Sequence, residues 1–152
     1  MNFETLYTTT DYYDGPRRGV ADFNGQPHFY ESCWADIDGE DDVFLLTPIS
    51  PDTLALALEA WAIWLRWEAA FRAGLTTRET HPAMPEDRTR HAELESLLKS
   101  QLTTNMSLAI PAKARFDDSQ CDQTGRRLDR VAWTVVPFDS SLDRRSDYHL
   151  NE

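Results

Sequence analysis

The sequence predicts an α+β fold: a mainly antiparallel β-sheet of about five to six strands, in N-terminal and C-terminal hairpins, packed on two central helices. Strand-like segments occupy both ends of the chain, and two helix-like segments lie between them. Because parallel sheets need strands and helices in alternation, this order favours antiparallel pairing. The length of 152 residues suits one domain. We expect that domain at residues 1–138, followed by a polar tail at 139–152.

The first part of the chain predicts strands joined by tight turns. Asn24 and Gly25 form a strong hairpin signal, because both central positions of a type I′ turn need positive φ. A second sharp reversal is expected at Asp14–Pro16, and an acidic turn at Asp36–Asp42. The strands expected here are 3–9, Gly19–Phe23, Gln26–Ala35 and Val43–Ile49.

The helical part begins at a clear boundary. Ser50 suits an N-cap, Pro51 suits the first helical position, and Asp52 favours the positive end of the helix dipole. We expect this helix to run to about Ala73 and to stop at Gly74. Apolar residues almost encircle it, which is typical of a buried helix, so we expect it to be the central element of the fold.

A second helix and a second hairpin complete the expected fold. Residues 86–103 place leucines on one face and charged side chains on the other, as in a helix that covers a core. Ser107–Phe116 and Arg130–Phe138 then indicate two strands, separated by a polar turn at 117–127.

The net charge of −11 excludes some partners. Nucleic acids and anionic membranes are disfavoured, because binding phosphates requires lysine and arginine, whereas a basic protein is permitted. The chain begins with no signal peptide pattern, and its longest apolar run is too charged to span a membrane. Cys33 and Cys121 form no paired motif, which favours free thiols. We therefore expect a soluble cytoplasmic protein of bacterial type.

Two polar segments are candidates for a binding surface: the aromatic and arginine-rich turn at Tyr12–Arg18 and the acidic turn at Asp36–Asp42. Turns that a sheet holds rigid commonly carry binding residues. The leading hypothesis is a non-enzymatic protein-binding module, inhibitor-like or immunity-like, whose partner is a basic protein, because complementary charge speeds encounter. The residues expected to bind are Tyr12, Tyr13, Asp14, Arg17, Arg18, Asp36, Asp38, Asp41 and Asp42.

An alternative hypothesis is a small enzyme or small-ligand-binding protein. Its pocket would lie between the first hairpin and the long helix. His28 with Asp11 or Asp14 would supply acid–base chemistry, and Arg17 or Arg18 would hold an anionic substrate. A homo-oligomer is a third possibility, which would require an exposed apolar patch.

Two acidic patterns in the sequence partly resemble metal sites. Asp36–Asp42 shares alternate acids and a glycine with calcium loops, but Trp34 stands where the first acid should be, so a solvated turn is favoured. Asp87, His91 and Glu95 share one face of the second helix, but zinc needs three or four convergent ligands, so an exposed polar stripe is favoured. We expect neither a metal nor a cofactor.

The tryptophans of the long helix allow two interpretations. Trp61, Trp64 and Trp67 are spaced by three, which could line an apolar pocket but is more typical of a core. Steps of three drift round a helix, so one ring could reach the surface. The common phosphate-loop, dinucleotide, serine-elbow and paired-zinc motifs are missing from the sequence, which argues against familiar enzyme classes.

Overall fold

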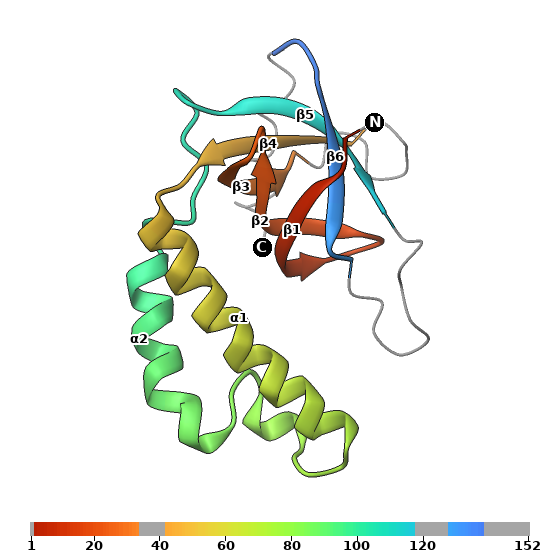
Figure 1. The fold of residues 1–152 in the computed structure, drawn as a ribbon. Helices are drawn as coiled ribbons and strands as arrows, with labels where there is room; N and C mark the ends of the chain where they lie inside the picture. Colours follow the sequence, from red (N-terminus) through yellow and green to blue (C-terminus); the bar gives the residue numbers. More distant parts are fainter. Residues whose placement is uncertain (1, 34–41, 118–127, 139–152) are drawn as a thin grey trace. The chain divides into compact units, whose positions relative to one another are not determined.

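The computed structural model describes residues 2–33, 42–117 and 128–138. The described residues form six strands that close into an antiparallel barrel, with each strand beside its neighbour in sequence and β1 beside β6 (Figure 1). The strands are β1 Glu4–Tyr12, β2 Pro16–Phe23, β3 Gln26–Ser32, β4 Val43–Pro48, β5 Ile110–Phe116 and β6 Arg130–Val135. The predicted α+β class with an antiparallel sheet is confirmed, and closure into a barrel is an additional finding.

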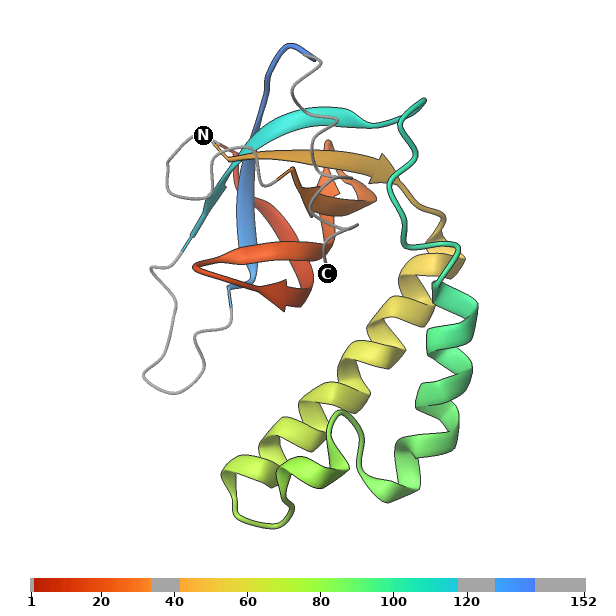
Figure 2. The ribbon, with the colours of Figure 1, turned by 180° about the vertical axis from the view of Figure 1, so that it is seen from behind.

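Two α-helices follow one another between β4 and β5: α1 (Pro51–Arg72) and α2 (Arg88–Leu98). Short 3₁₀ turns, η1 (Arg78–Thr80) and η2 (Pro85–Asp87), join them, and Figure 2 shows the two helices running side by side. The chain divides into two compact units, one made of residues 1–49 and 104–152 and the other of residues 50–103. We call them the barrel unit and the helical unit. None of the described helices is long and apolar enough to cross a membrane.

Several local predictions are confirmed. Asn24 and Gly25 have φ of 53° and 75°, and they join β2 directly to β3, as a two-residue hairpin turn requires. Ser50 caps α1, because its side chain accepts a hydrogen bond of 3.1 Å from the backbone N–H of Thr53. Gly74 follows the end of α1 with a φ of 74°.

Other boundaries differ from the predictions. β1 continues to Tyr12 and β2 already begins at Pro16, so both strands extend beyond the predicted 3–9 and Gly19–Phe23 as far as the sharp reversal that was predicted between them. The ladder between β1 and β2 contains register shifts, which bend a strand and obscure its alternating pattern. The later elements are also shorter than predicted, since α2 ends at Leu98, β5 begins at Ile110 and β6 ends at Val135.

The barrel encloses its own apolar core. Tyr30, Phe44 and Trp133 contact one another through their rings, with centroid distances of 5.7 to 5.9 Å. Smaller side chains such as Leu6 and Val131 surround this aromatic cluster. The described residues of this core all come from the barrel unit, so the helix that was expected to be the central element of the fold supplies none of them. Closure directs the inward-facing residues of each strand into a shared interior, which removes the need for a covering helix there.

The helical unit has a separate, smaller core in which Ile63 of α1 contacts Ala83 and Leu94. Only four described residues of α1 are buried, and Trp61 and Trp64 are half-exposed, with their rings stacked at 5.0 Å. The prediction that α1 is buried nearly all round is therefore wrong, although Trp67 is buried as a core residue. The sequence prediction of a single domain at 1–138 stays a prediction, and the predicted tail at 139–152 lies outside the described residues.

Candidate functional site

The turn between β1 and β2 presents two adjacent aromatic rings. Tyr12 and Tyr13 are 61% and 62% exposed, so two large rings that are adjacent in sequence are accessible to a partner. Asp14 and Gly15 follow with φ of 54° and 122°, and the Tyr13 N–H donates to the Gly15 carbonyl at 2.9 Å. The backbone of this turn is therefore closed tightly, and the rings project from a defined support.

Arg17 connects this turn to the segment before β4. Its side chain is only 7% exposed, and its Nε donates to the Tyr13 carbonyl oxygen at 2.6 Å. The same guanidinium donates to and pairs with the carboxylate of Asp42, whose side chain is 10% exposed. One buried cation thus ties the tyrosine turn to the last residue of the acidic segment.

Ser32 completes the environment of Asp42. The Ser32 hydroxyl, fully buried at the end of β3, lies 2.8 and 3.0 Å from the two carboxylate oxygens of Asp42. Burial raises the pKa of Asp42 above its ordinary value, while the Ser32 hydroxyl and the charge of Arg17 act in the opposite direction. A buried charge pair needs such additional hydrogen bonds, because its desolvation is expensive.

The structure brings three of the predicted binding residues, Tyr13, Arg17 and Asp42, into one connected group. Tyr12 and Asp14 flank this group on the turn and are exposed. Arg18 lies on β2 opposite Asp11 of β1 and opposite Glu31 of β3. The remaining predicted residues lie outside the described part of the chain: Asp36, Asp38 and Asp41.

Sequence reasoning did not anticipate the buried position of Arg17 or the part played by Ser32. A usable signal was present, since Arg17 and Arg18 are consecutive in a strand and consecutive strand residues face opposite sides. Only one of the two arginines could therefore face water. Arg17 bonds to the turn that carries the exposed tyrosines, and its role as a binding residue stays a prediction.

The residues of the alternative acid–base site do not come together. His28 is 6% exposed, with its Nδ1 2.8 Å from the Gln26 carbonyl oxygen and its ring edge-on to Phe23. His28 lies opposite Ala21 on β2, whereas Asp11 lies opposite Arg18. Three strand residues span about 10 Å. Asp14 lies beyond Asp11, in the turn that follows β1.

The polar residues expected on one face of the second helix lie in η2, which ends at Asp87, and in α2, and they form contacts with α1 and along α2. Asp87 accepts two hydrogen bonds of 3.0 Å from Arg66 of α1, and His91 lies 3.8 Å from Glu95. Within the ranges 2–33, 42–117 and 128–138, no group of three or more histidine, cysteine or acidic side chains is arranged to hold a metal ion.

Comparison with known protein families found no matching family, and neither the curated proteins nor the solved structures gave a significant match.

Proposed function

We propose that the barrel unit is a non-enzymatic protein-binding module that docks a basic protein on the β1–β2 turn and the acidic segment before β4. The observation that carries this proposal is the pair of exposed rings, Tyr12 and Tyr13, on a turn that buried Arg17 fastens to Asp42. Tyrosine is enriched among the residues that dominate binding energy in interfaces, because its ring is large, rigid and amphipathic.

The support beneath the rings favours binding over mere exposure. Because the turn is closed and its Tyr13 carbonyl is held by Arg17, its backbone loses little conformational freedom when a partner docks. The net charge of −11 would in addition speed the approach of a positively charged partner. An inhibitor-like or immunity-like role, in which an acidic module covers a basic protein, is consistent with both features.

We further propose that the protein works in the cytoplasm, because its two cysteines form no paired motif and a reducing compartment keeps such thiols reduced. No contact among the described residues favours the acid–base alternative, because His28 and Asp11 are separated along the sheet. The protein-binding proposal is therefore the one that we develop.

The proposal is tested with a double variant of the turn, Tyr12→Ser/Tyr13→Ser. The purified chain is immobilised and exposed to a native extract of its source cells at low and at high salt, and retained proteins are identified. We expect a partner rich in lysine and arginine that the wild type holds at low salt, that high salt releases, and that the double variant does not hold. Leu75→Ser serves as the control, since Leu75 is also exposed but belongs to the helical unit.

The proposal fails if no protein is retained at low salt, or if the double variant retains the same protein as the wild type. The proposal is also contradicted if the Leu75→Ser control fails to retain the partner, because the loss of binding would then not be specific to the turn.

A further inference from the structure

The helical unit contains an open hollow at the end of α1. Its volume is about 510 Å³, which is within the range of small-molecule sites, and it is more open to solvent than enclosed. Four of its lining residues lie in the last turns of α1, and two come from η1 and the residue after it. The lining residues are Trp67, Glu68, Phe71, Arg72, Arg78 and His81. Because all six belong to residues 50–103, the hollow is a property of the helical unit alone.

Local structure brings these residues together. Trp67 and Phe71 are four positions apart, as are Glu68 and Arg72, so each pair lies on one face of α1. The chain reverses after Gly74, and the indole N–H of Trp67 then donates to the Thr80 hydroxyl at 2.8 Å. This bond holds η1 against the final turns of α1.

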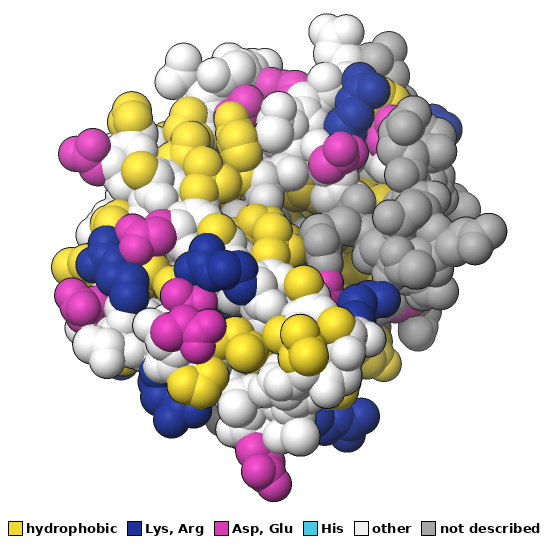
Figure 3. Space-filling model, turned by 60° about the horizontal axis from the view of Figure 1, so that its bottom comes forward, with side chains coloured by type: hydrophobic (Ala, Val, Ile, Leu, Met, Phe, Trp, Pro, Cys, Tyr) yellow, Lys and Arg dark blue, Asp and Glu magenta, His cyan; other side chains and the backbone are white. Residues whose placement is uncertain are grey.

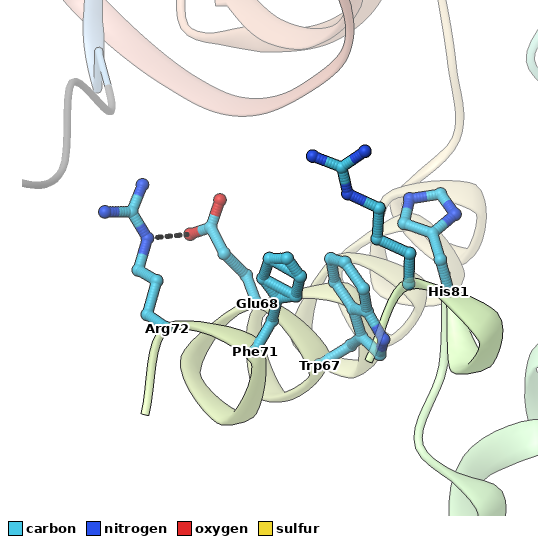
Figure 4. A pocket seen from close by; sticks show the side chains of 6 residues that line it. Trp67, Glu68, Phe71, Arg72 and His81 are labelled. Atoms are coloured by element: carbon cyan, nitrogen blue, oxygen red, sulfur yellow. Dashed lines mark ion pairs between the residues drawn. The ribbon is translucent and has the colours of Figure 1, made fainter. Parts of the chain in front are cut away.

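One wall of the hollow is aromatic. The rings of Trp67 and Phe71 are stacked at 5.1 Å, and the ring of His81 meets Trp67 edge-on at 4.6 Å (Figure 4). Trp67 is buried, so it forms a fixed floor and not a mobile surface side chain. Such a surface favours a flat ring, which gains contact area and the offset or edge geometries that aromatic pairs prefer.

The two arginines of the hollow differ in whether they form an ion pair among the described residues. Arg72 lies 3.9 Å from Glu68, and Figure 4 marks this ion pair. Arg78 has neither an ion-pair partner nor a hydrogen-bond acceptor for its side chain in the part of the chain that the structure describes. The hollow therefore combines an aromatic wall with a guanidinium whose fork of N–H donors is available to an anion.

The positive charge of Arg78 lies in a chain whose net charge is negative. The whole protein carries −11, although Figure 3 shows lysine and arginine side chains lying among acidic ones on one face. The overall field repels anions, so an anion that binds here must be held by local contacts. Non-specific attraction of an anionic probe is thereby disfavoured, which makes such a probe informative.

We propose that this hollow binds a small aromatic carboxylate, whose ring packs beside the stacked pair of Trp67 and Phe71 and whose carboxylate is held by Arg78. The guanidinium matches a carboxylate in shape and can donate two parallel hydrogen bonds to it. The site is separate from the tyrosine turn and does not depend on the protein-binding function.

The test uses 2-naphthoate as the probe on the full chain, measured by isothermal titration calorimetry. Two comparison probes separate the contributions: 2-naphthamide keeps the ring without the charge, and cyclohexanecarboxylate keeps the charge without the aromatic ring. We expect 2-naphthoate to bind about tenfold more tightly than 2-naphthamide, since a hydrogen bond to a charged group is worth that much. It should also bind more tightly than cyclohexanecarboxylate, which lacks the aromatic contacts and the larger apolar area. Binding should also shift the indole N–H resonance of Trp67 in a two-dimensional NMR spectrum.

Variants locate the site. Arg78→Gln is expected to weaken 2-naphthoate binding about tenfold while changing 2-naphthamide binding little. Arg88→Gln is the matched control, because Arg88 is an exposed arginine of α2 outside the hollow, and it should leave both affinities unchanged. The Tyr12→Ser/Tyr13→Ser variant should bind 2-naphthoate as the wild type does, which separates this inference from the proposed function.

Four results would overturn the inference, three of them in the binding measurements. These are absence of 2-naphthoate binding at about millimolar concentration, equal binding by Arg78→Gln and the wild type, and equal loss with Arg88→Gln. Binding that leaves the Trp67 indole resonance unchanged would also overturn it, because the probe would then occupy another place.

Discussion

Gly19 shows how one residue allows a long-range hydrogen bond inside the barrel. The Tyr30 hydroxyl on β3 reaches across β2 and donates to the Thr8 carbonyl on β1 at 2.8 Å. Gly19 lies between them, and a Cβ there would be 2.1 Å from the Thr8 oxygen and 2.7 Å from the Tyr30 hydroxyl. The bare backbone at this point is what lets the three strands connect. Burial of this hydroxyl raises the pKa of Tyr30 far above its ordinary value, so it stays a donor.

We therefore predict that Gly19→Ala destabilises the protein by about 3 kcal/mol or more, because the added methyl group overlaps backbone atoms that cannot move alone. Urea unfolding of wild type and variant measures the difference. Gly25→Ala is the control: nothing lies within 4 Å of its Cβ, but its φ of +75° should cost about 1 kcal/mol. Equal stability of Gly19→Ala and the wild type would contradict the prediction.

Arg17 and Asp42 permit a second prediction for single residues. Arg17→Met leaves the buried carboxylate of Asp42 without its cation, so we expect a loss of about 3 kcal/mol or more. The double variant Arg17→Met/Asp42→Leu removes both charges and should be less destabilised than the sum of the two single variants. Chemical denaturation of all four proteins completes the cycle. Simple additivity would show that the two side chains are not coupled.

Among the elements, the two helices are joined by ion pairs at their surfaces. Arg90 donates to both carboxylate oxygens of Glu59, at 2.6 and 2.8 Å, and Arg66 does the same to Asp87 at 3.0 Å. The hydrogen bonds from these arginines lower the pKa of Glu59 and of Asp87. From the sequence, α2 was expected to contact a core through its leucine face and to keep its charged side chains on the opposite face. These ion pairs show that some of the charged side chains also contact α1.

The direction of the pH effect follows from the lowered pKa values. The unfolded chain takes up protons at the ordinary values of 4.5 for glutamate and 3.8 for aspartate, before the folded helices do. The stabilisation is therefore present above about pH 4.5 and is lost as the pH falls through the lowered folded-state values. We expect the thermal midpoint, followed by far-ultraviolet circular dichroism, to fall modestly in that range and also on adding salt.

Glu59→Gln/Asp87→Asn provides the control for this prediction. This variant should be less stable than the wild type at neutral pH and should show a smaller further loss on acidification, because its amides do not titrate. An identical acid response in the variant and the wild type would show that other carboxylates cause the effect.

For the whole molecule, the position of the helical unit in the chain yields a further prediction. β4 and β5 are neighbours in the barrel, with Leu46 opposite Ile110, and Thr104 and Asn105 bond to Glu31 and Thr47 of the same unit. The segments on both sides of the helical unit are therefore fixed by contacts within the barrel unit. We predict that replacing Ser50–Thr103 by a short glycine–serine linker leaves a folded barrel.

The shortened chain should keep the near-ultraviolet dichroism of Trp133 and its aromatic neighbours and lose the helical signal. If the near-ultraviolet signal is retained, the barrel unit folds without the helical unit, and residues 1–138 contain two domains. An unfolded shortened chain would contradict the prediction and would support the single domain inferred from sequence.

Local patterns were sufficient for the parts of the fold that depend on neighbouring residues. The Asn24–Gly25 turn and the Ser50 cap were predictable because each is decided within a few residues by φ preferences and side-chain hydrogen bonding. The turn between β1 and β2 was predicted for the same reason, but the buried side chains that support it were not. The link from Arg17 to Asp42 joins residues 25 positions apart, and no local pattern encodes it.

By itself the sequence determined the class of the fold, the order of its elements, the main turns and the acidic character of the chain. Tertiary structure alone decided that the strands close into a barrel, that the barrel and the helices have separate cores, and that Arg17 lies inside. The hollow beside Trp67 also depends on it. The physical reason is that closure, core formation and buried pairing depend on contacts between distant segments, whose free energy a local pattern does not contain.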